Sequence, residues 1–168
     1  QPRLDGPSHS DREVMQYRLL PVSPEDQPWL EGLRRSVYQD LFFATWGEWD
    51  EARHLRHCTA CWDRGHILAI EVNGGRVGML QRFERPDVVE VGEIQINPSH
   101  QGRGIGTRIL RDTMVGAHAA GKTVVLSAGL QNHRAVKLYE RLGFQCVSRS
   151  DTHVHMQSAP EQFSDPAR

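Results

Sequence analysis

Hydrophobic and polar residues follow one another along the chain in two periods, one typical of strands and one typical of helices. Apolar or alternating runs predict strands at 16–22, 66–72, 76–83, 87–96, 123–128, 144–149 and 152–157. Helical apolar spacing predicts helices at 23–41, 45–64 with a break at Gly47, 107–120 and 132–143. The resulting order, β-α-α-β-β-β-α-β-α-β-β, predicts an α/β (α+β) sandwich, with a mixed central sheet of about six to seven strands and helices on both faces.

The fourth predicted strand changes its apolar face part-way along. Val89 and Val91 place the odd positions toward the core, whereas Ile94 and Ile96 place the even positions there. Side chains alternate strictly along a regular strand, so one extra residue must be accommodated between the two pairs. Gly92 lies at that point, and glycine is typical of such a kink. The pattern therefore predicts a β-bulge near Gly92.

A bulge at this point has a chemical consequence, because it brings Glu90, Glu93 and Gln95 to the same face of the strand. Two carboxylates beside a break in strand pairing are typical of an acid/base site. The alternative is that both are solvated charges on a half-exposed strand. The sequence leaves these two interpretations open.

A glycine-rich loop, HQGRGIGT (100–107), lies directly ahead of the third predicted long helix. Gly102, Gly104 and Gly106 allow successive backbone N–H groups to point in one direction, and Arg103 adds a positive charge. A helix N-terminus supplies unpaired donors and a positive partial charge, so the loop suits a phosphate or pyrophosphate group. The spacing fits neither the dinucleotide fingerprint nor the phosphate loop of NTPases.

Two motifs frame the helix and strand that follow this loop. Gln101, Gly104 and Gly106 form Q-x-x-G-x-G, and the second motif, N-x-x-A-x-x-x-Y-x-x-x-G-F, is formed by Asn132, Ala135, Tyr139, Gly143 and Phe144. In this order and spacing they resemble the GNAT superfamily of N-acetyltransferases. The resemblance covers 76–157 by motif and 15–75 by element order.

The resemblance implies acetyl-CoA as co-substrate and no metal. Loop amides would bind the CoA pyrophosphate, and the bulged strand would pair with the pantetheine arm. The residues implied in cofactor binding are Ile94, Gln95, Ile96, Gln101, Gly102, Arg103, Gly104, Ile105, Gly106, Thr107, Asn132 and Ala135.

The resemblance also implies catalytic roles. Tyr139 would protonate the departing thiolate. The alternative to this catalytic role is that Tyr139 is a core aromatic residue on an amphipathic helix. A carboxylate would take the proton of the attacking amine, because an alkylammonium has a pKa of about 10.4 in water. Glu90 is slightly preferred over Glu93 for this task. A backbone N–H near Ile96 is expected to hold the oxyanion.

Two further clusters have both a chemical and a packing interpretation. His54, His57, Cys58 and Cys61 lie within eight residues of a predicted helix, but a single straight helix rarely closes four tetrahedral zinc ligands, so a packing role is favoured. Trp46, Trp49 and Asp50 could contact a cationic acceptor through cation–π and charge pairing. The alternative interpretation of these three residues is structural: a capped helix start with buried tryptophans.

Composition excludes several partner classes. The chain has 24% charged residues and a formal net charge of −1, so no nucleic-acid-binding surface is expected. It has no apolar run of about 18 residues, so no membrane partner is expected. Its three cysteines form no disulfide framework, which favours a reducing cytoplasm, and Cys146 is expected in the core.

The domain is expected at 15–157 as one GNAT domain. Residues 1–14 lack periodicity and predict an arm that is disordered or introduced by cloning, and 158–168 predict a flexible tail. The expected function is transfer of an acetyl group from acetyl-CoA to a primary amine by direct attack in a ternary complex. Two alternative functions stay open: an acyl-CoA-binding regulatory module, and an acetyltransferase that acts on protein or peptide amines. The chain could also form a homodimer.

Overall fold

Seven strands form one sheet in the order β1-β2-β3-β4-β5-β7-β6 in the computed structural model, which describes residues 15–160. The strands are β1 (Tyr17–Pro21), β2 (Ile67–Val72), β3 (Gly75–Glu84), β4 (Val88–Ile96), β5 (Thr123–Gly129), β6 (Gln145–Arg149) and β7 (His153–Ser158). The helices are α1 (Gln27–Trp46), α2 (Glu51–Arg64), α3 (Ile105–Ala119) and α4 (His133–Arg141), with short 3-10 helices at Pro24–Asp26 and Pro98–His100. The expected element order and fold class are confirmed.

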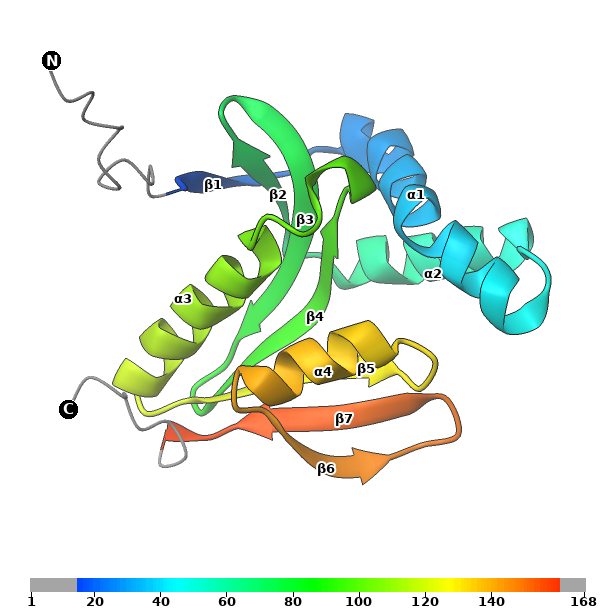
Figure 1. The fold of residues 1–168 in the computed structure, drawn as a ribbon. Helices are drawn as coiled ribbons and strands as arrows, with labels where there is room; N and C mark the ends of the chain where they lie inside the picture. The colour runs from blue at the N-terminus through cyan, green and yellow to red at the C-terminus, as the bar shows by residue number, and fades with distance from the viewer. Residues whose placement is uncertain (1–14, 161–168) are drawn as a thin grey trace, which may run out of the picture.

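The helices cover both faces of the sheet (Figure 1). On one face, α3 and α4 pack onto the main core, which includes Ile109 and Leu110 of α3 and the buried Tyr139 of α4. On the other face, α1 and α2 enclose a smaller cluster around Leu33 and Met79. This two-sided packing explains why the central strands are apolar on both faces.

The break between α1 and α2 follows local sequence signals. Gly47 ends α1 in the left-handed conformation, at φ 73°, which a residue with a side chain rarely adopts. Asp50 then caps α2, because its side chain accepts a hydrogen bond from the Arg53 backbone N–H at 3.0 Å. These two signals place the end of one helix and the start of the next.

Strand β4 contains the expected bulge. Glu93 lies opposite Gln81 of β3, whereas Val91 lies opposite Arg82, so Gly92 is the additional residue. A Cβ atom at Gly92 would lie 2.7 Å from the side-chain oxygen of Gln81, closer than side chains normally approach. Glycine is thus required by packing as well as by the bulge.

Strand β7 ends at Ser158, one residue beyond the domain boundary expected at 157. Cys146 lies on β6 and is exposed, so its expected place in the core is wrong. The strand β6 is exposed at every position, since it is the edge of the sheet. The expectations for residues 1–14, and for the tail from 161 onward, fall outside the described residues.

Across residues 15–160, no helix combines the length and apolar character needed to cross a membrane.

Candidate active site

A groove runs from the glycine-rich loop along β4 to α4, with a volume of about 1450 Å³ when the open solvent at its mouth is included. We call it the glycine-loop groove. Its lining includes all but one of the residues predicted to bind the cofactor: Ile94, Gln95, Ile96, Gln101, Gly102, Gly104, Ile105, Gly106, Thr107, Asn132 and Ala135. The exception is Arg103. The strand β4 and the loop after it therefore meet α4, which is distant in the sequence, and α1 completes the lining with Val37, Tyr38 and Leu41.

The loop leads into a helix N-terminus that no side chain caps. Gly104 is the N-cap of α3, in the left-handed conformation at φ 80°. The first-turn amides have no partner within the helix itself, and the helix dipole places a positive partial charge there. The Gln101 side chain donates a hydrogen bond to the Ile96 carbonyl at 2.8 Å, which ties the loop to the end of β4.

The neighbouring strands β4 and β5 pair over only part of their length. Their parallel register joins Val88, Val89 and Glu90 to residues 123–125, and it stops there. From Val91 to Ile96, β4 has no β5 partner, so backbone groups on this edge are available to a ligand. The bulge at Gly92 lies where the two strands separate.

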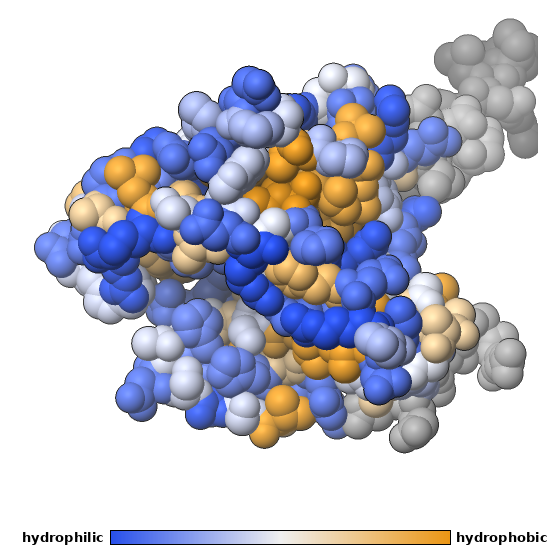
Figure 2. Space-filling view, turned by 180° about the vertical axis from the view of Figure 1, so that it is seen from behind, coloured by the Kyte–Doolittle hydropathy of each residue, from blue (hydrophilic) through white to orange (hydrophobic). Residues whose placement is uncertain are grey.

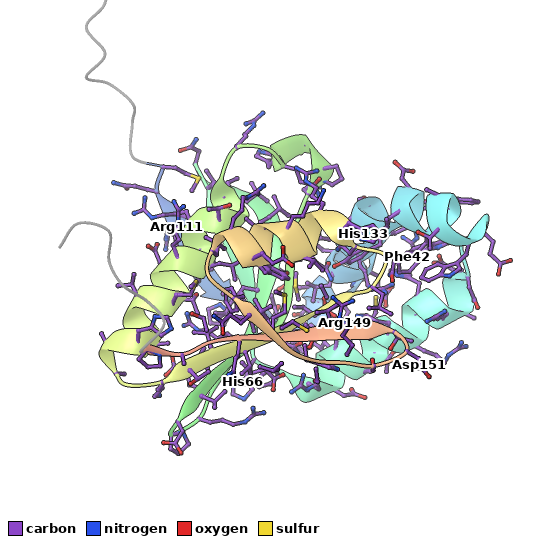
Figure 3. All side chains as sticks on the ribbon, turned by 60° about the horizontal axis from the view of Figure 1, so that its bottom comes forward. Phe42, His66, Arg111, His133, Arg149 and Asp151 are labelled. Atoms are coloured by element: carbon purple, nitrogen blue, oxygen red, sulfur yellow. The ribbon has the colours of Figure 1, made fainter. Side chains whose placement is uncertain are left out.

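A second pocket, of about 800 Å³ when the open solvent at its mouth is included, occupies the space between the separated strands. We call it the β4–β5 pocket. Its walls come from α1, α2, β4, β5 and the start of α4, including Tyr38, Phe42, His57, Glu93 and Ser127. Figure 2 shows a hollow between the surface formed by α1 and α2 and that formed by β6 and β7. Phe42 and His133, at the start of α4, lie on the same side of the molecule (Figure 3).

Tyr139 lies where the two spaces meet. It lines both the glycine-loop groove and the β4–β5 pocket, together with Tyr38, Ile94, Asn132 and Ala135. Burial raises the pKa of the Tyr139 phenol to about 12, and the nearby Glu93 carboxylate adds to this shift. The hydroxyl is therefore protonated at neutral pH and can donate a proton or a hydrogen bond.

Glu93 lines the β4–β5 pocket and is held by two side chains. Its Oε1 lies 2.7 Å from His57 Nε2, and its Oε2 accepts a hydrogen bond from Gln95 Nε2 at 3.4 Å. The glutamate side chain is 18% exposed. A carboxylate with one neighbour that can exchange protons, in a sheltered pocket, suits general base chemistry.

Glu90 lies on the same side of β4 but in a different environment. Its carboxylate forms ion pairs with Arg64 at 2.9 Å and Arg85 at 3.0 Å. Burial alone would raise the pKa of Glu90, but the hydrogen bonds from both arginines outweigh it and hold the pKa below its ordinary value. Glu90 is not among the residues that line either space.

Comparison with known proteins identifies the family. The sequence profile of the acetyltransferase (GNAT) family matches residues 32–144, more than half of the chain. The chain belongs to the acetyltransferase (GNAT) family. The match runs from the first part of α1 to the residues just after α4, so it includes the whole lining of the glycine-loop groove and, except for His153, that of the β4–β5 pocket.

Several curated proteins are similar to this GNAT chain. An uncharacterized N-acetyltransferase of Methanocaldococcus jannaschii is 29% identical over 124 residues, 64% of this chain and 55% of that protein. The N-alpha-acetyltransferase RimI of Mycobacterium tuberculosis is 40% identical over 86 residues, 49% of this chain and 53% of its own length. The chain thus spans about half the length of the curated relatives it matches.

Solved structures share the fold of this GNAT domain at lower sequence identity. An acetyltransferase from Thermus thermophilus has a TM-score of 0.67 at 19% identity, with 87% of this chain and 98% of that chain covered. The PaiA N-acetyltransferase from Thermoplasma acidophilum, solved in complex with coenzyme A, has a TM-score of 0.62 at 15% identity, covering 86% and 99%. These likenesses show the fold.

The residues predicted to bind the acceptor lie elsewhere in this GNAT domain. Trp46 ends α1 and is 49% exposed, and Asp50 caps α2. The Trp49 ring contacts Phe42 and His54 at centroid distances of 5.4 and 5.0 Å. None of the three lines the β4–β5 pocket. Their neighbour Phe42 lines it instead, one helical turn before the end of α1.

The His/Cys cluster of α2 divides between two environments rather than converging. His57 meets Glu93, whereas His54 accepts a hydrogen bond from Arg34. Among the described residues, no group of three or more His, Cys, Asp or Glu side chains is placed to hold a metal ion.

Several residues that line the β4–β5 pocket were not predicted as site residues from the sequence, among them Arg34 and Tyr38, and His57 was considered only as a zinc ligand. Arg34 and Tyr38 are four residues apart and so lie on one face of α1. That spacing was visible in the sequence, but which face of α1 meets the separated strands depends on tertiary packing.

Proposed function

We propose that this protein is an acetyl-CoA-dependent N-acetyltransferase that transfers the acetyl group directly to a primary amine in a ternary complex. The observation that carries this proposal is the meeting of two spaces at Tyr139. One space suits an anionic, extended cofactor and the other suits an amine. A transfer without a covalent enzyme intermediate needs both ligands to meet at one point.

The glycine-loop groove fits acetyl-CoA. The uncapped N-terminus of α3 would bind the pyrophosphate, and the free edge of β4 from Val91 to Ile96 would pair with the pantetheine arm. When bound, acetyl-CoA supplies a thioester as the acetyl donor. Arg103 lies outside the lining, so its role would be limited to long-range attraction of phosphate.

Glu93 is the proposed base, assisted by His57. It takes the proton that the attacking amine loses, directly or through one water, while His57 and Gln95 hold its two oxygens in place. Glu90, slightly preferred from the sequence, is a weaker candidate because two arginines occupy its carboxylate. We propose that Glu90 shapes the start of the bulged segment by fixing α2 to β4.

Tyr139 is the proposed acid. Its hydroxyl forms no hydrogen bond with any described residue, so it is free to meet the sulfur that leaves when the C–S bond breaks. A phenol that stays protonated is suited to stabilise a developing thiolate.

The experiment that tests the function is release of CoA thiol from acetyl-CoA, measured against a panel of amino acids, polyamines, aminoglycosides and peptides. At least one amine class should raise thiol release about 100-fold or more above hydrolysis, as expected for combined acid–base catalysis. If acetyl-CoA binds but no amine raises its turnover, the regulatory module is the correct function.

The peptide alternative has support from one relative, the N-alpha-acetyltransferase RimI of Mycobacterium tuberculosis. The same assay separates it from a small-molecule enzyme, because peptides would then be turned over faster than free amines.

A further inference from the structure

A buried arginine on α1 has no anionic partner. Arg34 is 8% exposed and lines the β4–β5 pocket on one side. On its other side it lines a smaller inner cavity between α1, α2 and the sheet. Within residues 15–160, Arg34 takes part in no ion pair with Asp or Glu. Glu31, one turn earlier on the same helix, lines the inner cavity but lies beyond ion-pair distance.

The direct contacts of Arg34 are with an imidazole and two aromatic rings, none of which carries a negative charge. Its Nη1 donates a hydrogen bond to His54 Nδ1 at 2.9 Å. A guanidinium can only donate, so His54 accepts as a neutral imidazole. Burial, followed by the Arg34 charge, lowers the pKa of His54, which is consistent with that state. The rings of Tyr38 and Phe42 lie 5.3 and 5.7 Å from the guanidinium carbon, and they attract a cation without neutralising it.

One nitrogen of Arg34 has no hydrogen-bond partner among residues 15–160. Nε is buried and forms no hydrogen bond. A buried charge is costly unless it is paired, and buried polar groups are normally hydrogen-bonded. The adjacent Arg35, which is 37% exposed, is paired with Glu51 in the ordinary way. Arg34 therefore lacks a carboxylate partner at the pocket wall, and a ligand anion in the pocket would pair with the charge of its guanidinium group.

We propose that the acceptor carries a carboxylate beside its amine, and that Arg34 binds this carboxylate while Glu93 receives the amine. The inference rests on the proposed acetyl transfer at the same pocket. One wall supplies a buried cation and another supplies a sheltered carboxylate. This charge pattern is complementary to a molecule with both charges, such as a free amino acid. A polyamine would place cations against Arg34, and a peptide N-terminus would leave Arg34 without its anion.

The first test compares matched ligands and needs no variant. Alanine, leucine, phenylalanine and glutamate are each assayed beside the corresponding amide and the decarboxylated amine, with acetyl-CoA saturating. For at least one amino acid, kcat/KM should be about tenfold or more above the values for its amide and its decarboxylated amine, as a charge-assisted hydrogen bond allows. Equal turnover of the acid, the amide and the amine overturns the proposal. Faster turnover of amides or peptides overturns it in favour of a peptide acceptor.

The second test measures binding separately from turnover. Calorimetry on the protein–CoA complex compares the same acids and amides. Tighter binding of an acid than of its amide supports the anion site even if no amine is acetylated, in which case only the proposed activity fails. Equal binding, or no binding of either, overturns the anion site.

Variants then assign the preference to Arg34. Arg34→Gln should bring the acid-to-amide ratio close to one, and Arg34→Lys should keep part of it because the charge remains. Arg35→Gln is the matched control on the neighbouring position, and it should keep the wild-type ratio. An unchanged ratio in a folded Arg34→Gln variant means that another residue recognises the carboxylate. Thermal melting shows whether each variant is folded.

Discussion

At the residue scale, two glutamates of one strand differ only in their neighbours. Glu93 meets a histidine and an amide, whereas Glu90 meets two arginines. A carboxylate that forms ion pairs with two guanidinium groups is a weak base, because both pairs stabilise its charged form. Moving it would break both ion pairs. The sequence placed both on one face, and the partners from neighbouring elements distinguish them.

Replacing each glutamate by glutamine separates their roles. Glu93→Gln should lower kcat by about 100- to 10,000-fold, the usual range for loss of a general base. Glu90→Gln should lower kcat much less, because Glu90 lines neither space and acts only by fixing α2 to β4. Steady-state rates of thiol release, with acetyl-CoA binding as the control, check both. A larger loss in Glu90→Gln than in Glu93→Gln would reverse the assignment.

At the scale of the element, the bulge in β4 joins fold and site. Gly92 shifts the register so that the first part of the strand pairs with β5 and the remainder is free. The side chain of Gln81, on β3, packs against the bulge at Gly92. Its amide group donates to the Cys61 and Gly65 carbonyls, each at 2.9 Å, so it cannot easily move aside.

Adding one methyl group at Gly92 tests this packing. Gly92→Ala should reduce the free energy of unfolding by about 1–3 kcal/mol, because overpacking a fixed neighbour is destabilising. The control is Gly116→Ala in α3, where nothing lies within 4 Å of the added atom. That variant should gain about 0.5–1 kcal/mol from helix propensity. Urea unfolding measures both, and a Gly92→Ala variant as stable as the wild type would contradict the argument.

At the scale of the whole molecule, the two halves of the sheet separate between β4 and β5, and helices of both faces close the gap. Tyr139 stands at the meeting point of the two spaces, and it is 8% exposed. The same burial that keeps its hydroxyl protonated couples its ionisation to folding.

Stability should therefore fall at high pH. The pKa of Tyr139 is raised from 10.0 to about 12 in the folded state, so its contribution is complete below pH 10. It is lost between pH 10 and 12, at about 1.4 kcal/mol per pH unit for one fully coupled group. Urea unfolding at pH 9 to 12 should show a smaller fall in Tyr139→Phe than in the wild type. Identical falls would mean that Tyr139 ionises freely.

The sequence alone determined the order of the elements, the bulge and the glycine loop. Each of these depends on residues close together in the chain: the change of parity from Val91 to Ile94, the left-handed glycines, and the cap at Asp50. Such signals act through local backbone geometry, so they can be read without the tertiary structure.

Only the tertiary structure decided which side chains share a pocket. Arg34 and His57 reach β4 because α1 and α2 pack across the same face of the sheet, and the contact of His57 with Glu93 joins residues 36 positions apart. The identity of the preferred carboxylate, the unpaired charge of Arg34 and the place of Trp46 outside the pocket all follow from that packing. Helix orientation is set by the burial of many side chains together, and no short stretch of sequence specifies it.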